Sequence, residues 1–219
     1  MICRGGNDEI RMTNDECCGG VCVKRLTNGF GDWNKRRYNA AFTLIELIVV
    51  IAIIIVLAGL ILSTVGYVQK KGARSRAETE IAAMSAACES YKADNGIYPR
   101  DATTSDVLDA RISGNPTNYQ SASLYLYKQL SGTNADRTPI AGAKSYFAFK
   151  PNQLSPSDQT LPVEFIRDPF GNSYGYSTIQ AATGDSTKGY NPTFDLWSTS
   201  GLTTTPPTAA ITQQWIKNW

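Results

Sequence analysis

Residues 42–62 read FTLIELIVVIAIIIVLAGLIL, and from Leu47 to Leu62 this stretch contains no polar side chain. As a helix that rises about 1.5 Å per residue, it would extend roughly 30 Å, which matches the hydrocarbon core of a bilayer. A core helix of a soluble protein rarely stays apolar on every face over this length. The stretch therefore predicts a membrane-spanning helix near the N-terminus.

A secretory signal peptide is the alternative interpretation of such a stretch. Its apolar part usually has about 7–15 residues and ends in a cleavage site of small residues. Here the apolar run is longer, and the small pair Ala40-Ala41 precedes it. Basic residues flank both ends of the run, at 35–37 and at 70–76, so the positive-inside rule does not decide its orientation.

The composition argues against an enzyme and against a nucleic-acid-binding protein. The 219 residues include no histidine, which removes the commonest general base and metal ligand. No paired carboxylates, nucleophile–base pair or phosphate-binding loop stands out, and the formal net charge is only +2. We therefore expect no catalytic residue, no cofactor, no metal site and no nucleic-acid partner.

Cysteine usage separates the start of the chain from the rest. Cys3, Cys17, Cys18 and Cys22 lie in residues 1–41, and Cys88 stands alone beyond them. The spacing of the first four fits no common zinc site. We interpret residues 1–41 as a long leader without its own fold, or as an upstream start-site assignment, in preference to a metal-binding module. Cys88 is interpreted as a small apolar residue on a helix face.

The helix is predicted to continue past the apolar stretch, over Thr43–Asp94. Its second part is polar but carries an apolar stripe at spacings of three, four and three residues, formed by Ile81, Met84, Cys88 and Tyr91. Asn95-Gly96 is a stop signal, and Pro99 follows it. We expect the stripe to face the core of the head that follows, not to form a ligand site.

Residues 96–219 predict a small head with an antiparallel sheet, which with the long helix gives an α+β fold. Four short aromatic or β-branched runs are expected to be strands: Ser145–Lys150, Val163–Ile166, Ser173–Thr178 and Thr193–Thr199. Asp168–Asn172 reads as a turn, and a short helix is expected at Ala122–Leu130. The aromatic residues expected in the core, rather than around a cleft, are Tyr146, Phe147, Tyr174, Tyr176 and Trp197.

Glu46 is the unusual residue of the apolar stretch. At the bilayer centre a carboxylate costs about 2.5–3.5 kcal/mol on insertion scales, and less near a helix end. One interpretation places Glu46 at headgroup depth, about one turn from the helix start. The other gives it a functional partner.

The string Ala41-Phe42-Thr43-Leu44-Ile45-Glu46-Leu47, followed by the apolar run, resembles the class III signal of type IV pilins and type II secretion pseudopilins. The resemblance implies that a prepilin peptidase cleaves between Ala41 and Phe42 on the cytoplasmic side and N-methylates Phe42. It also implies that Glu46 pairs with the α-amino group of Phe42 on a neighbouring subunit. The family usually has glycine where this chain has Ala41, a small residue that the cleavage site is expected to tolerate.

Within that family, the head is most similar to the major (G-type) pseudopilin. Three stretches carry this resemblance: Arg76–Pro99, Asp168–Tyr174 and Phe194–Ser198. Many type IV pilins close a C-terminal loop with a disulfide, whereas this chain has a single cysteine after residue 41, which favours a pseudopilin. The G-type relatives follow their last strand with an Asp-rich calcium loop, whereas residues 198–211 contain no carboxylate here.

The resemblance implies a pilin fold in four parts. These are a cytoplasmic, cleaved leader at 1–41, a transmembrane and filament-core half-helix at 42–62, an amphipathic half-helix at 63–95, and a variable region with the β head at 96–219. The expected location is the inner membrane with the head in the periplasm, followed by assembly into a periplasmic pseudopilus.

The function that the resemblance implies is that of a structural subunit of a type II secretion pseudopilus, supporting protein export. Its implied partners are copies of itself in a helical filament, minor pseudopilins, the prepilin peptidase, the inner-membrane assembly platform, and membrane lipid before assembly. Two alternatives stay open: a type IV pilus subunit for adhesion, motility or DNA uptake, and a membrane-anchored extracytoplasmic binding module.

Overall fold

The computed structural model describes residues 17–18, 21–22 and 42–219. Strands β1 (Cys17–Cys18) and β2 (Val21–Cys22) pair antiparallel, with the Cα of Cys17 opposite that of Cys22. Residues 1–16, 19–20 and 23–41, which include Cys3 and Ala41, lie outside the described residues.

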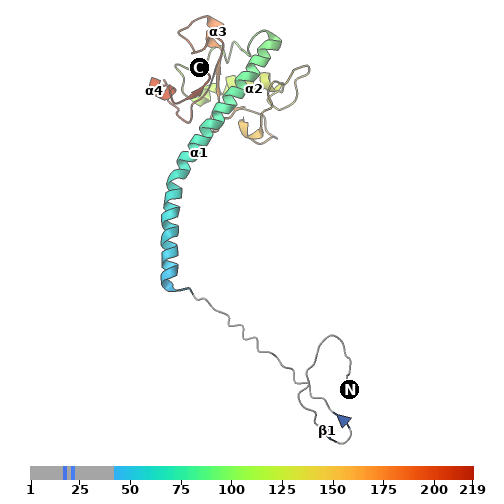
Figure 1. The fold of residues 1–219 in the computed structure, drawn as a ribbon. Coiled ribbons are helices and arrows are strands. Elements are labelled where there is room, and N and C mark those ends of the chain that lie inside the picture. Colours follow the sequence, from blue (N-terminus) through green and yellow to red (C-terminus); the bar gives the residue numbers. More distant parts are fainter. Residues whose placement is uncertain (1–16, 19–20, 23–41) are drawn as a thin grey trace. The chain divides into compact units, whose positions relative to one another are not determined.

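The long helix expected at Thr43–Asp94 is confirmed, because α1 spans Leu44–Asn95 as one element (Figure 1). It ends at the predicted stop signal. Gly96 has a φ of +78°, a conformation that glycine adopts without steric cost, and its N–H donates to the Lys92 carbonyl at 2.7 Å.

The head consists of short elements after α1. In chain order they are η1 (Pro116–Tyr119), α2 (Gln120–Ser131), η2 (Pro151–Gln153), β3 (Leu154–Ser155), β4 (Phe165–Ile166), β5 (Gly175–Ser177), α3 (Ile179–Thr183), β6 (Asp195–Ser198), α4 (Ala209–Thr212) and β7 (Ile216–Lys217). Strands β3 and β4 form one antiparallel pair, and β5, β6 and β7 form a three-stranded antiparallel sheet with β6 in the middle. The predicted α+β fold, a long helix packed on small antiparallel sheets, is confirmed.

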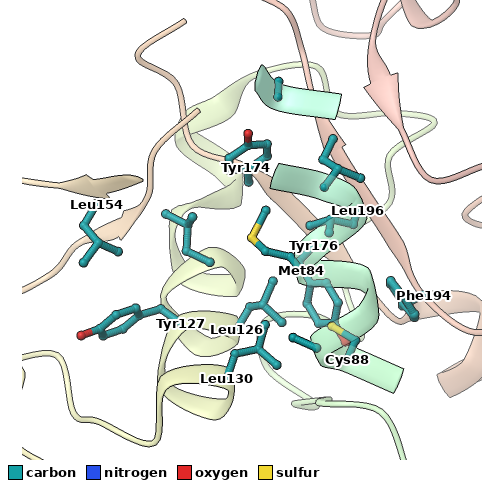
Figure 2. Close-up of a cluster of buried hydrophobic side chains, with 14 of the residues drawn as sticks. Met84, Cys88, Leu126, Tyr127, Leu130, Leu154, Tyr174, Tyr176, Phe194 and Leu196 are labelled. Carbon is teal, nitrogen blue, oxygen red and sulfur yellow. The ribbon is translucent and has the colours of Figure 1, made fainter. Parts of the chain in front are cut away.

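The main core lies between α1, α2 and the strands, as Figure 2 shows for its labelled side chains. From α1 it receives Ala77, Ile81, Met84, Ala87 and Cys88, all at most 4% exposed. The stripe predicted from the sequence therefore does face the core, with Tyr91 packed at its edge. Burial also raises the pKa of the Cys88 thiol, so this residue behaves as the small apolar group that the sequence indicates.

The aromatic residues expected in the core are there. Tyr174, Tyr176 and Trp197 are at most 1% exposed, and Tyr146 and Phe147 are partly buried against the main core. Trp197 lies with Trp215 and Tyr119 in a second buried cluster, against which Ile211 and Trp219 pack. The C-terminal tail is thus held to the head by apolar contacts.

The strand predicted at Ser145–Lys150 is wrong. The structure has no strand there, because the N–H groups of Tyr146 and Phe147 both donate to the carbonyl of Leu130, at 2.8 and 2.9 Å. These amides satisfy a carbonyl near the C-terminal end of α2, where a helix leaves its last acceptors unpaired. The backbone of this run therefore caps a helix and is not available to a sheet.

The other local predictions are confirmed, with shorter strands and a longer helix than expected. Strands β4, β5 and β6 lie inside the three remaining predicted runs, and α2 extends the predicted Ala122–Leu130 helix at both ends. The Asp168–Asn172 turn is present, closed by hydrogen bonds between the backbones of these two residues and of Gly171 and Asp168. Strands β3 and β7 have only two residues each, and no pattern in the sequence predicted them.

Candidate functional site

The first turn of α1 is built around Thr43 and Glu46. The Thr43 N–H and hydroxyl both donate to Glu46 Oε2 at 2.8 Å, and the Glu46 N–H lies 3.3 Å from Thr43 Oγ1. This reciprocal arrangement is a capping box, in which two otherwise unpaired amides at a helix start are satisfied. The Glu46 carboxylate is therefore fixed in direction by the turn that it closes.

The structure describes two of the three predicted site residues, Phe42 and Glu46. Phe42 is 84% exposed, and Glu46, four residues on, is exposed in the first helical turn. A negative charge is favoured here by the positive end of the helix dipole. Ala41, the other residue of the predicted cleavage site, lies outside the described residues. Cleavage, methylation and the intersubunit ion pair stay predictions.

Thr43 was not among the residues predicted to form the site. A threonine followed three residues later by a glutamate, just before an apolar run, is nevertheless the sequence signature of a capping box. This local signature is present at Thr43 and Glu46. Both donors that hold Glu46 Oε2 come from Thr43.

The part of the chain that the structure describes leaves the apolar segment 42–62 exposed. Its large side chains are between 47% exposed, at Ile51, and 84% exposed, at Phe42. An 18-residue window of the helix has a mean hydropathy of 3.3 and none of it is buried. By length and composition this segment can cross a membrane, a property that signal sequences share.

A buried polar network joins α1 to the head where α1 begins to pack. Glu80, only 7% exposed, accepts from the Tyr174 hydroxyl at 2.7 Å and pairs with Arg76 at 2.8 Å. Burial raises the pKa of Tyr174, and the nearby Glu80 charge raises it further, so the phenol stays a donor. This contact fixes one face of α1 against the segment that leads into β5.

Three carboxylates in the head's C-terminal half are already engaged. Asp168 accepts from the amides of Phe170 and Asn172 and from the Ser198 hydroxyl. Asp195 accepts from two backbone amides, and Asp185 from Thr187. Among the described residues, no group of three or more cysteine, aspartate or glutamate side chains is placed to hold a metal ion.

Residues 198–211 are held by contacts that involve no carboxylate of their own. The loop backbone at Thr204 packs closely on Gly114. A Cβ added at Gly114 would lie 1.7 Å from the Thr204 carbonyl oxygen. Arg74 of α1 donates to the Gln214 carbonyl at 2.8 Å, just beyond the loop. Backbone contact at Thr204 and a hydrogen bond just after the loop thus fix this segment.

The head also has a small hollow beside the end of α1. It encloses about 240 Å³ and is lined by residues that include Lys92, Tyr98 and Arg100. Pockets for small molecules usually enclose about 300–1,000 Å³. The charged groups here are partly engaged, since Arg100 pairs with Asp106 at 2.8 Å. This hollow is a weak basis for a binding-module interpretation.

A comparison with known protein families gives a match that includes the start of α1. Residues 36–62 match the family described as the prokaryotic N-terminal methylation motif. This match contains Phe42, the capping box and the whole apolar run. The start of the long helix therefore carries the N-terminal methylation motif.

Two similar curated proteins share one name, type II secretion system core protein G. The chain is 36% identical over 84 residues to type II secretion system core protein G of Vibrio cholerae, and 35% identical over 82 residues to the protein of that name in Pseudomonas aeruginosa. These alignments cover 38% and 37% of this chain and 55% and 58% of the relatives. The chain thus spans about half the length of the curated relatives that it matches. Its similarity is to the type II secretion pseudopilins.

Proposed function

We propose that the chain is a structural subunit of a type II secretion pseudopilus, assembled through α1 to support protein export. One observation carries the proposal. A single helix has an apolar first part that the described chain leaves exposed and a second part whose stripe is buried in a folded head. A membrane before assembly, and neighbouring copies after it, would cover the first part without disturbing the second.

Processing defines the four parts of the proposed subunit. A prepilin peptidase removes residues 1–41 by cleavage between Ala41 and Phe42 and methylates the new Phe42 amine. Residues 42–62 anchor the mature chain in the inner membrane, residues 63–95 carry the helix into the periplasm, and residues 96–219 form the periplasmic head. The match of the methylation motif, which begins ahead of Phe42 and runs to Leu62, supports this division.

Glu46 sets the register of assembly in this proposal. Its partner is the Phe42 α-amino group of a neighbouring subunit, and a pair removed from water stabilises only when its geometry is well matched. The Thr43 donors hold the carboxylate in place before a neighbour arrives. This preorientation lowers the entropy lost when the intersubunit pair forms.

The remaining partners follow from the type II secretion relatives. They are the minor pseudopilins, the inner-membrane assembly platform, the prepilin peptidase and lipid. No enzymatic step is part of the proposal, in which the chain acts by occupying a place in a helical filament.

Mass analysis of the N-terminal peptide from membrane-extracted protein tests processing. We expect a peptide that begins with methylated Phe42. A mature chain that retains residues 35–41, or one that begins after Leu62, contradicts the proposal.

Two substitutions of Glu46 separate its charge from its capping role. Glu46→Gln keeps an oxygen for Thr43 but removes the charge, whereas Glu46→Leu removes both. We expect both variants to insert in the membrane and filament yield to fall at least tenfold, the effect of about 1.4 kcal/mol lost per contact. Glu164→Gln, on the exposed surface of the head, is the matched control. Normal filament yield with Glu46→Gln would mean that capping suffices and that the ion pair is wrong.

A further inference from the structure

Residues 65–71, VGYVQKK, connect the apolar run to the part of α1 that packs on the head, and we call them the neck. Their side chains are exposed, with Tyr67 at 70% and Val68 at 63%. Tyr67, Lys70 and Lys71 are spaced by three and four residues, so they share one face of the helix. The neck thus presents an aromatic residue and two cations side by side.

The two neck lysines differ from the cations that follow them. Arg74 pairs with Glu78 at 3.3 Å and Arg76 with Glu80 at 2.8 Å. For Lys70 and Lys71, the part of the chain that the structure describes offers no ion pair within 4.0 Å and no side-chain hydrogen bond. Two adjacent positive charges are therefore left for a partner outside the head.

The position of the neck along the helix indicates the depth of that partner. Lys70 lies eight residues after Leu62, or roughly 12 Å at 1.5 Å per residue. Helical side chains lean toward the N-terminus, so the ammonium groups reach back toward the apolar run by several ångströms. The headgroup zone on each side of a bilayer is roughly 5–8 Å thick. The two ammonium groups can therefore lie at the level of lipid phosphates, with the Tyr67 ring nearer the hydrocarbon, where aromatic residues are favoured.

We propose that the neck binds anionic phospholipid headgroups of the phosphatidylglycerol class, in the leaflet that faces the head. The inference rests on the proposed function, since it requires residues 42–62 to span a membrane. Lys70 and Lys71 contact the phosphates, and Tyr67 fixes the depth of the helix in the interface. The contact holds a waiting subunit at one height, and it must break when the subunit leaves the membrane for a filament.

A lipid fits these lysines better than a carboxylate of a second copy. Five carboxylates at the surface of the head and the end of α1 already have hydrogen-bond partners close by: Asp101 with Thr103, Asp136 with Thr138, Asp158 with Thr160, Asp185 with Thr187, and Asp94 with Lys144. A second copy would have to give up such contacts to pair with the neck. A lipid phosphate at headgroup depth is present before any copy arrives.

The test uses the full chain reconstituted in vesicles of phosphatidylcholine with about a third phosphatidylglycerol. Electron spin resonance with spin-labelled phosphatidylglycerol and phosphatidylcholine measures which lipid associates with the protein. We expect the wild-type chain to prefer phosphatidylglycerol, and Lys70→Gln/Lys71→Gln to reduce that preference by up to about fivefold for each lysine. The matched control is Lys150→Gln/Lys188→Gln, which removes two exposed head lysines and should leave the preference unchanged.

Three results would overturn the inference. They are no phosphatidylglycerol preference in the wild type, a preference that survives in Lys70→Gln/Lys71→Gln, and an equal loss in the head control. If the neck variant instead loses cross-linking between copies while keeping its lipid preference, the lysines serve a second copy. Basic residues 35–37 are the same in all three proteins, so only differences between variants are read. Failure of the chain to float with vesicles would sink the membrane anchor and the proposed function, whereas flotation without lipid preference sinks only this inference.

Discussion

The two parts of α1 share one backbone but have opposite surroundings. At Ile54 the side chain is 57% exposed, while thirty residues later Met84 is 1% exposed. The second part carries its apolar residues as a stripe and buries them in the head, whereas the first is apolar on all sides. An apolar surface that the described part of the chain leaves bare indicates a partner beyond that part. The second part of α1 folds the head, whereas the first part is left for a partner, which in the proposed function is a membrane or other subunits.

Truncating one side chain in each part should give the largest contrast. Met84→Ala should lower the free energy of unfolding of the head by about 2–5 kcal/mol, because it removes buried volume from a packed core. Ile54→Ala should change it by less than about 0.5 kcal/mol, because no head contact is lost. Denaturant unfolding of the full chain in detergent, followed by the fluorescence of buried Trp197 and Trp215, measures both.

The same pair of variants tests whether the first part of α1 contributes to the stability of the head. If Ile54→Ala destabilises the head as much as Met84→Ala does, the first part of α1 packs on the head and is not reserved for partners. A lower filament yield with Ile54→Ala, at unchanged head stability, would sharpen the division of tasks.

Glycines give a second contrast between the head and the helix. A Cβ at Gly175 would lie 2.2 Å from the Trp197 ring, which is fully buried, so Gly175→Ala should destabilise the head by about 1–3 kcal/mol. At Gly72, in α1, a Cβ would meet nothing within 4 Å, and Gly72→Ala should stabilise the helix by up to about 1 kcal/mol. Thermal unfolding and helicity measured by circular dichroism test the two signs. A destabilising Gly72→Ala would show that this position is not open.

These contrasts also show how far the sequence could lead. The apolar run, the 81–91 stripe and the Asn95-Gly96 stop are local patterns, so they predicted α1 and its buried face. The run at Ser145–Lys150 looked like a strand, but its amides are used by the Leu130 carbonyl, a partner that no local pattern reveals. The hydrogen bond to buried Glu80 comes from Tyr174, 94 residues away, and could not be predicted from spacing. The capping role of Thr43 was readable, since its signature is local.

The pH dependence of stability should separate buried from exposed carboxylates of the head. Burial raises the pKa of Asp168, and the charge of nearby Glu80 raises it further. Hydrogen bonds from Ser198, Asn172 and Phe170 act in the opposite direction, but the net shift is upward. Because its folded-state pKa is raised, Asp168 stabilises the head at a pH below its unfolded-state pKa. This stabilisation is lost as the pH rises through the folded-state pKa. Compared with wild type, Asp168→Asn should therefore gain relative stability as pH rises from acid toward neutral.

Asp136 supplies the control of opposite sign. Hydrogen bonds from Thr138 lower its pKa, so its stabilisation is present above the unfolded pKa and is lost as pH falls through the folded value. Asp136→Asn should lose relative stability over the same rise in pH. Unfolding midpoints of both variants across a pH series decide the matter, and a shared sign would show that burial does not govern Asp168.

The smallest expected effect is that of calcium. We expect calcium to leave the melting temperature of the head unchanged. Calcium takes six to eight oxygens and usually several carboxylates, which offset the cost of removing its water. Residues 198–211 contain no carboxylate, and the nearest acids, Asp168 and Asp195, accept hydrogen bonds that a bound ion would have to replace. The loop is instead fixed by its contact with Gly114 and by the apolar packing of Ile211 and Trp215.

Thermal melts of the full chain in detergent, with calcium and with chelator, measure this directly. A site filled at 100 times its dissociation constant would add about 2.7 kcal/mol, enough to raise the melting temperature by several degrees. Gly114→Ala supplies a positive control for loosening the loop, since its Cβ would collide with the Thr204 carbonyl and should lower the melting temperature with or without calcium. A rise on adding calcium that Asp168→Asn or Asp195→Asn removes would show that these carboxylates leave their present partners to bind the ion. The loop would then be held by a ligand and not by packing.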